Sequence, residues 1–272
     1  MLYSSALAAA VLAFTAAALP SKPFPPVRAR ATDDSPDIGA ITSVPQSSFT
    51  SYQTGGLVRA NITDTTIGKR WTCATTPTLT WGDADTGGPG ITINNADSNY
   101  QGFYIYYNNC DLIPWKYIWI AGGGTEFVSL PTDFQGRVVR GIDSQNLDGQ
   151  AHPLGSWLEL GIDSAGIWGD VSLIRGCDGG VLMWTTDGSN AWKGFTQWIL
   201  DGAPDGAYDQ KTDGQWVLKY TENVDLSINT IPRDYYIEKV GAEYVYVDDD
   251  HGSPVILGTN SRFATYWPSG RP

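Results

Sequence analysis

The stretch from Gly155 to Gly180, GSWLELGIDSAGIWGDVSLIRGCDGG, constrains the fold of this chain more than any other. Its two apolar runs lie on either side of a Gly-containing turn, DSAG, which predicts a β-hairpin. Pairing the two arms back from this turn places Glu159 directly opposite Asp170. Because side chains alternate along a strand, one face then carries the apolar residues Leu158, Leu160, Ile162, Ile167, Val171 and Leu173. The other face carries Trp157, Glu159, Trp168 and Asp170.

This register places two carboxylates side by side, which is unfavourable by itself. Like charges directly opposite each other in a sheet cost up to about 1 kcal/mol. A shift of one residue would turn the apolar side chains outward, and each of them is worth roughly 1.5–3 kcal/mol when buried. We therefore expect the core to hold the acids together, with Arg140 as a nearby cation or with one proton shared between them. The alternative is a surface hairpin with two solvated acids and a register shifted by one residue.

The first part of the chain has the composition of a secretory leader. A short apolar run that ends in small residues predicts a signal peptide over residues 1–18, and therefore a secreted protein of the extracellular space or cell wall. Residues 19–40 are rich in proline and predict a pro-segment or a disordered linker. Residues 41–89 are rich in Ser and Thr and are expected to form an N-terminal extension. Within it, Asn61 starts an N-glycosylation sequon.

The charge and the aromatic content narrow the class of partner. The net charge is -12, which argues against binding to nucleic acid or to an anionic membrane surface. The chain has 11 Trp and 14 Tyr but few charged residues, a composition that suits stacking on a neutral polymer. We expect a monomer without a cofactor.

Three cysteines predict one disulfide and one free thiol. We favour a bond between Cys110 and Cys177, because both flank predicted strands. With only two histidines and no Cys-x-x-Cys motif, we expect no zinc site. The run Asp248-Asp249-Asp250 lacks the spacing of a dedicated calcium loop, so a solvated turn is the simpler interpretation.

From residue 90 to residue 270 the chain consists of short β-branched or aromatic runs separated by Gly, Asn and Pro, and one of the expected strands is DYYIEKV at 234–240. This spacing predicts a mainly β domain, an antiparallel β-sandwich or barrel. The segment 193–201 breaks the rhythm with apolar residues at helical spacing, and it predicts one short helix.

Three blocks in this domain, taken in order, resemble the thaumatin-like superfamily. GRVVRG resembles the strand that carries a functional arginine, and SWLELGI followed by GDVSLIRG resembles the hairpin of a glutamate strand and an aspartate strand. EYVYVDDDHG followed by GTNSRFATYW is similar to the acidic turn and the closing strand. The leader and the low cysteine count are those of a cysteine-poor, fungal secreted branch.

The resemblance implies a thaumatin-like antiparallel β-sandwich with a small second lobe, held around the helix at 193–201. It also implies an acidic cleft that binds β-1,3-glucan. Matched residue by residue, it implies Glu159 and Asp170 as candidate catalytic acids and Arg140, Asp248 and Asp249 as cleft residues. The family's second aspartate is Arg175 here, so Asp178 would have to replace it. Trp157 and Trp168 would flank the cleft.

We expect a secreted protein that binds a β-1,3-glucan-type cell-wall polysaccharide through this acidic, Trp-flanked cleft. Two alternatives stay open. A weak endo-β-1,3-glucanase would use Glu159 and Asp170 as its carboxylate pair, although directly opposed residues leave little room for an inverting mechanism. A non-catalytic secreted effector or structural wall protein would use the fold without sugar chemistry.

Overall fold

The structure is a computed structural model, and it describes residues 72–223 and 225–268. The predicted signal peptide, the predicted linker and Asn61 lie outside these residues. None of the described helices has the length and apolar character needed to span a bilayer.

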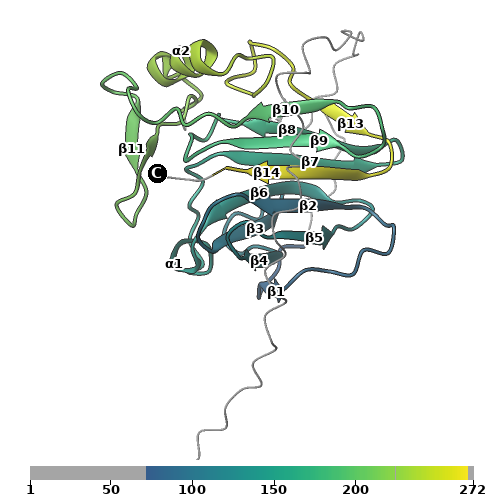
Figure 1. Ribbon diagram of the computed structural model, residues 1–272. Helices are drawn as coiled ribbons and strands as arrows, with labels where there is room; N and C mark the ends of the chain where they lie inside the picture. Colours follow the sequence, from purple (N-terminus) through teal and green to yellow (C-terminus); the bar gives the residue numbers. More distant parts are fainter. Residues whose placement is uncertain (1–71, 224, 269–272) are drawn as a thin grey trace, which may run out of the picture. The chain divides into compact units, whose positions relative to one another are not determined.

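The described residues form two larger sheets, one small hairpin and two helices (Figure 1). The seven-stranded sheet has the order β1 (Thr78–Thr80), β4 (Lys116–Ile120), β3 (Gln101–Tyr107), β6 (Gln135–Gly141), β7 (Trp157–Asp163), β8 (Gly166–Ser172) and β13 (Ile256–Gly258). The five-stranded sheet has the order β10 (Trp192–Phe195), β9 (Val181–Thr185), β14 (Arg262–Trp267), β2 (Gly90–Asn95) and β5 (Thr125–Ser129). The hairpin pairs β11 (Tyr208–Gln210) with β12 (Trp216–Leu218), and the helices are α1 (Asp143–Asn146) and α2 (Thr230–Lys239).

The prediction of a mainly β fold is confirmed, but its purely antiparallel character is wrong. β1 pairs with β4 in parallel, and β2 pairs with β14 in parallel, whereas the other strand pairs of the two larger sheets are antiparallel. The parallel partners are far apart in the sequence, so no hairpin turn between them signals the pairing.

The two larger sheets pack face to face around one apolar core. Phe103 of β3 meets Trp267 of β14 edge to face, with 5.2 Å between the ring centroids. Nearby, the backbone of Gly169 in β8 approaches Phe263 of β14 so closely that a Cβ atom at this position would lie only 2.7 Å from the ring. A glycine is therefore required where the sheets come closest.

A partly buried ion pair joins the two sheets at one edge. Lys116 of β4 donates to the Asp83 carboxylate at 2.8 Å and to the carbonyl of Ser129, which lies in β5 of the other sheet. Although burial alone would raise it, the pKa of Asp83 is lowered to about 2 by the hydrogen bonds from Lys116 and Ser129. Residues 72–89, predicted as an extension, thus contribute both β1 and Asp83 to the packed sheets.

The helix predicted over residues 193–201 is wrong. β10 occupies Trp192–Phe195 and pairs with β9, so the start of this segment is an edge strand. The longer helix is α2, in the sequence TIPRDYYIEK, where β-branched and aromatic residues indicated a strand. Tertiary contacts outweigh that local preference, because the hydroxyl groups of Tyr235 and Tyr236 donate to the carbonyls of Ile199 and Lys219. Pro232 is tolerated because it lies in the first turn.

The region around α2 and the β11–β12 hairpin corresponds to the expected second lobe. Figure 1 shows α2 above the sheets and β11 at their left end. Tyr236, Leu218 and Ala207 from this region are fully buried in the same cluster as the core of the sheets. The region therefore shares the main core rather than having one of its own.

The predicted disulfide between Cys110 and Cys177 is wrong. Cys110 is bonded to Cys73, with the two Cα atoms 5.3 Å apart, and Cys177 is a free, buried thiol. The backbone of Cys177 is hydrogen-bonded to Leu218, which fixes it beneath the β11–β12 hairpin. The position of a cysteine next to a strand therefore does not predict its disulfide partner, because it does not show on which side of the core the thiol lies.

We expect non-reducing peptide mapping to find Cys73 linked to Cys110 and Cys177 as the free thiol. The bond closes a loop with a sequence separation of 37 residues. Its reduction should therefore lower the free energy of unfolding by about 4 kcal/mol, as chain entropy predicts for a loop of this length. Denaturant titration with and without reductant measures this loss. A peptide that links Cys110 to Cys177 would contradict the assignment.

Candidate functional site

The β7–β8 hairpin has the register expected from the sequence. Glu159 lies opposite Asp170, and Leu158 lies opposite Val171. Both Leu158 and Val171 are fully buried in the core between the sheets. The apolar face thus holds the two acids together on the outer face of the seven-stranded sheet, as predicted.

Both acids are buried rather than open to solvent. The exposed fraction is 7% for Glu159 and 1% for Asp170. The Oδ1 atom of Asp170 has no hydrogen-bond partner in the described part of the chain. A substrate cannot reach either carboxyl group unless the side chains above them move.

Burial sets the protonation of the pair. Burial raises the pKa of Asp170 well above its ordinary value, and the charge of Glu159 raises it further. Burial also raises the pKa of Glu159, but Arg137, a hydrogen bond from Ser172 and the charge of Arg175 oppose this shift. Asp170 is consequently the neutral member of the pair and Glu159 the one that carries the negative charge first.

The cation that faces the pair is Arg137, and the prediction that Arg140 lies beside it is wrong. Arg137 in β6 lies directly opposite Glu159 in β7. Arg140 is three residues further along the same strand, so its side chain leaves the opposite face of the sheet. Its guanidinium donates instead to the carbonyls of Pro268, at 2.7 Å, and Asp178, at 3.2 Å.

Arg137 lies between two aromatic rings on the outer face. Its guanidinium carbon is 4.6 Å from the ring centroid of Tyr106 and 4.1 Å from that of Trp157. It also forms an ion pair with Asp111 at 2.8 Å, next to the disulfide-bonded Cys110. A buried cation in this position both compensates Glu159 and packs against the indole of Trp157.

The two tryptophans flank the acid pair along the strands. Trp157 precedes Glu159 by two residues in β7, and Trp168 precedes Asp170 by two residues in the antiparallel β8, so they lie on opposite sides of the pair. The Trp157 indole N–H donates to the carbonyl of Pro153 at 2.8 Å. The Trp168 indole N–H donates to the carboxylate of Asp163 at 3.2 Å. Each ring is therefore oriented by a hydrogen bond of its own.

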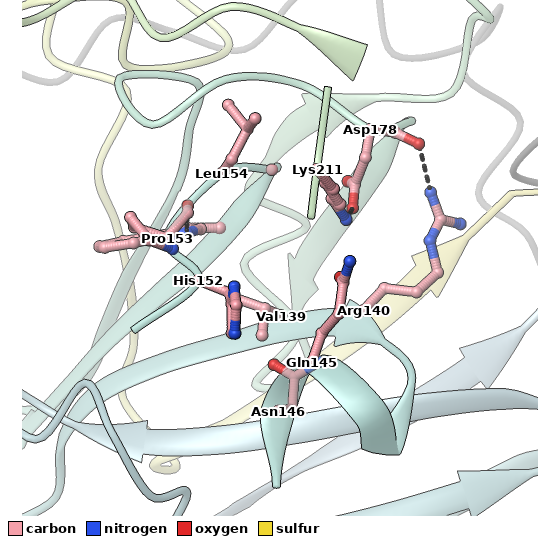
Figure 2. Close-up of a pocket in the computed structure, with 11 residues that line it drawn as sticks. Val139, Arg140, Gln145, Asn146, His152, Pro153, Leu154, Asp178 and Lys211 are labelled. Atoms are coloured by element: carbon pink, nitrogen blue, oxygen red, sulfur yellow. Dashed lines mark hydrogen bonds and ion pairs between the residues drawn. The ribbon is translucent and has the colours of Figure 1, made fainter. Parts of the chain in front are cut away.

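A small pocket opens beside Trp157, at the ends of β6 and β7 (Figure 2). Figure 2 shows the charged groups of Arg140 and Lys211 near Asp178, with the amide side chains of Gln145 and Asn146 below them. Its lining consists of Val139, Arg140, Gln145, Asn146, His152, Pro153, Leu154, Gly155, Trp157, Asp178 and Lys211.

Asp178 is the charged centre of the pocket wall. Its carboxylate accepts hydrogen bonds from the Lys211 ammonium at 2.6 Å and from the backbone N–H of Ser156 at 3.1 Å. Although burial alone would raise it, the pKa of Asp178 is lowered by the charges of Lys211 and Arg140. The residue thus stays ionised and connects the start of β7 to the β11–β12 hairpin.

The rim of the pocket is formed by hydrogen-bonded polar side chains from α1 and from loops. His152 contacts the Asp148 carboxylate at 2.8 Å through Nε2 and the Thr212 hydroxyl at 3.4 Å through Nδ1. Gln145 donates to the same hydroxyl at 3.4 Å. The sequence did not indicate Gln145, His152 or Lys211 as site residues, because they come from α1, a loop and the β11–β12 turn and belong to no motif.

The acidic turn lies apart from this pocket lining. Asp248 is buried, and its carboxylate contacts His251 Nδ1 at 2.8 Å and the Arg233 guanidinium at 3.7 Å. It also accepts the backbone N–H groups of Asp250 and His251. Asp249 is exposed. Within the described residues, no group of three or more His, Cys, Asp or Glu side chains is placed to hold a metal ion.

No protein-family model and no curated protein sequence matches this chain. The site is therefore interpreted from its own geometry and chemistry.

We expect Asp170→Asn to stabilise the protein at neutral pH. The pKa of Asp170 is raised in the folded state. The contribution of its protonated carboxyl group to the free energy of unfolding is therefore fully present below the unfolded pKa of about 4, and it is lost as the pH rises through the folded pKa. The amide does not ionise, so the stability advantage of the variant over wild type should be smallest at pH 4 and increase as the pH rises to 8. Urea titrations across this range measure the difference.

Asp201→Asn, at an exposed position, is the matched control and should show no such change. If Asp170→Asn were less stable relative to wild type at pH 8 than at pH 4, the account of a neutral Asp170 would be wrong.

Proposed function

We propose that this protein is a secreted carbohydrate-binding protein that recognises a β-1,3-glucan-type cell-wall polysaccharide. The observation that carries the proposal is the pocket beside Trp157, where an oriented indole adjoins a ring of fixed polar groups. In this proposal the acid pair has a structural role, because Glu159 holds Arg137 in place and Arg137 packs against the indole of Trp157.

The polar groups of the pocket match the hydroxyl groups of a sugar. Carboxylates accept hydrogen bonds from hydroxyls, ammonium and guanidinium groups donate to them, and amides and imidazole do either. The indole offers an apolar face with a polar edge, which suits a sugar ring that presents C–H groups on its face. The net charge of -12 favours a neutral polymer over an anionic one.

Secretion and family membership are part of the same proposal. The leader over residues 1–18 and the disulfide between Cys73 and Cys110 fit an oxidising compartment. The packing of two β-sheets, with the glutamate strand paired to the aspartate strand, is compatible with a cysteine-poor branch of the thaumatin-like superfamily.

The alternative with specific support is a weak endo-β-1,3-glucanase. A neutral Asp170 beside an ionisable Glu159 is the combination of protonation states that glycosidases use. Burial of both carboxyl groups weighs against it, because neither reaches a bound sugar. Binding without hydrolysis is therefore the better-supported function.

We expect the protein to be retained on insoluble β-1,3-glucan and not on cellulose or chitin. Trp157→Ala removes the indole beside the pocket and should weaken retention about tenfold, equivalent to ~1.4 kcal/mol. Trp192→Ala is the matched control, since this half-buried indole lies in the other sheet and stacks on Tyr244. Depletion assays with all three polymers measure the effect. Equal recovery in the unbound fraction on all three polymers would contradict the proposed function.

We expect no release of reducing ends from laminarin, because Glu159 and Asp170 are closed to solvent. A reducing-sugar assay over pH 3–9 tests this. A bell-shaped pH profile that disappears in Glu159→Gln would instead establish the glucanase.

A further inference from the structure

The outer face of the seven-stranded sheet carries a second set of aromatic side chains, at its β4 edge. Tyr117 and Trp119 lie two residues apart in β4, on the same face, and both are half-buried. Tyr117 stacks on Tyr104 of β3 with the rings 5.7 Å apart and nearly parallel. Beyond them, at the sheet edge, Leu79 of β1 lies next to Tyr117 and is 42% exposed. We call Tyr117 and Trp119 the β4 platform.

A carboxylate from α1 lies at the edge of the β4 platform. Asp143 accepts hydrogen bonds from the Trp119 indole N–H at 3.0 Å and from the Tyr104 hydroxyl at 2.6 Å. These bonds fix the orientation of the indole, and Asp143 is itself exposed. An oriented ring beside a carboxylate is also found at the pocket, where the carboxylate is the buried Asp178.

The β4 platform and the pocket belong to the same cross-strand row. Tyr117 lies opposite Tyr104, Tyr104 opposite Val139, and Val139 opposite Trp157. Val139 and Trp157 line the pocket. Neighbouring strands are about 4.8 Å apart, so three steps across the sheet separate Tyr117 from Trp157 by roughly 14 Å. α1 lies between them, because Asp143 contacts the platform while Gln145 and Asn146 line the pocket.

We propose that one glucan chain binds both places, with one end against Trp157 at the mouth of the pocket and the rest passing over α1 to the β4 platform. This inference rests on the proposed function and extends it, since it makes the ligand a polymer rather than a mono- or disaccharide. The ring faces of Tyr117 and Trp119 pack on sugar faces, and Asp143 accepts a sugar hydroxyl.

The charges of the β4 platform favour a neutral polysaccharide as the occupant. Asp143 is the charged group that contacts it, and the ammonium of Lys116 lies on the other face, paired with Asp83. An anionic polymer would meet both this carboxylate and the overall negative charge of the protein. A neutral polysaccharide with many hydroxyls is repelled by neither the carboxylate nor the net charge. Its hydroxyls also match the polar groups of the pocket at the other end of the row.

Calorimetric titration of the full chain with a β-1,3-linked disaccharide and a β-1,3-linked hexasaccharide tests the inference. For the wild type, the hexasaccharide should bind at least tenfold more tightly than the disaccharide. Trp119→Ala and Tyr117→Ala should each lower hexasaccharide affinity about five- to tenfold and leave disaccharide affinity unchanged. Trp157→Ala should lower both affinities, and Trp192→Ala should change neither.

The outcomes separate the two proposals. If both platform variants fold, by circular dichroism, and bind the hexasaccharide as tightly as wild type does, the platform inference is wrong while pocket binding stands. The same holds if the wild type binds both oligosaccharides equally tightly. If the wild type binds neither oligosaccharide nor laminarin, the proposed function is wrong, and the platform inference falls with it.

Discussion

The pairing of β7 with β8 is the interaction on which the rest of the site depends. Leu158 and Val171 bury their side chains between the sheets, and this burial fixes the register. The same register forces Glu159 against Asp170 on the opposite face. The cost of placing two acids together is limited because Asp170 stays neutral and Arg137 faces Glu159 from the next strand. Arg137 in turn packs against the indole of Trp157. The register set by the core therefore determines where this indole lies beside the pocket.

A second buried charge organises the ends of the strands. Asp178 accepts hydrogen bonds from Ser156, at the start of β7, and from Lys211, in the β11–β12 hairpin, while its carbonyl accepts one from Arg140. Loops that are distant in the sequence therefore meet at one ionised carboxylate. Removing one partner would leave the other charges buried without compensation, which makes this cluster a structural anchor as well as a pocket wall.

The hairpin and its acid pair could be predicted because alternation and turn chemistry act locally, within residues 155–180. Arg137 could not be distinguished from Arg140, since the choice depends on the pairing of β6 with β7. The Cys73–Cys110 bond and the parallel strand pairs depend on contacts between distant segments, which a single sequence does not display. α2 was mistaken for a strand because its tyrosines have β propensity, whereas their hydroxyls and rings are held by tertiary contacts. The pocket could not be predicted either, because Gln145, His152 and Lys211 are distant in the sequence and come together only in the folded chain.

The central claim is that the outer face binds sugar beside the acid pair and not between its carboxyl groups. The most direct test is a crystal structure of the protein with a bound β-1,3-linked oligosaccharide. The account predicts a sugar ring against the indole of Trp157, with its hydroxyls hydrogen-bonded to pocket residues such as Gln145 and His152. Glu159 and Asp170 should remain buried beneath it. A sugar ring seated between the carboxyl groups of Glu159 and Asp170, with Trp157 displaced, would contradict the account.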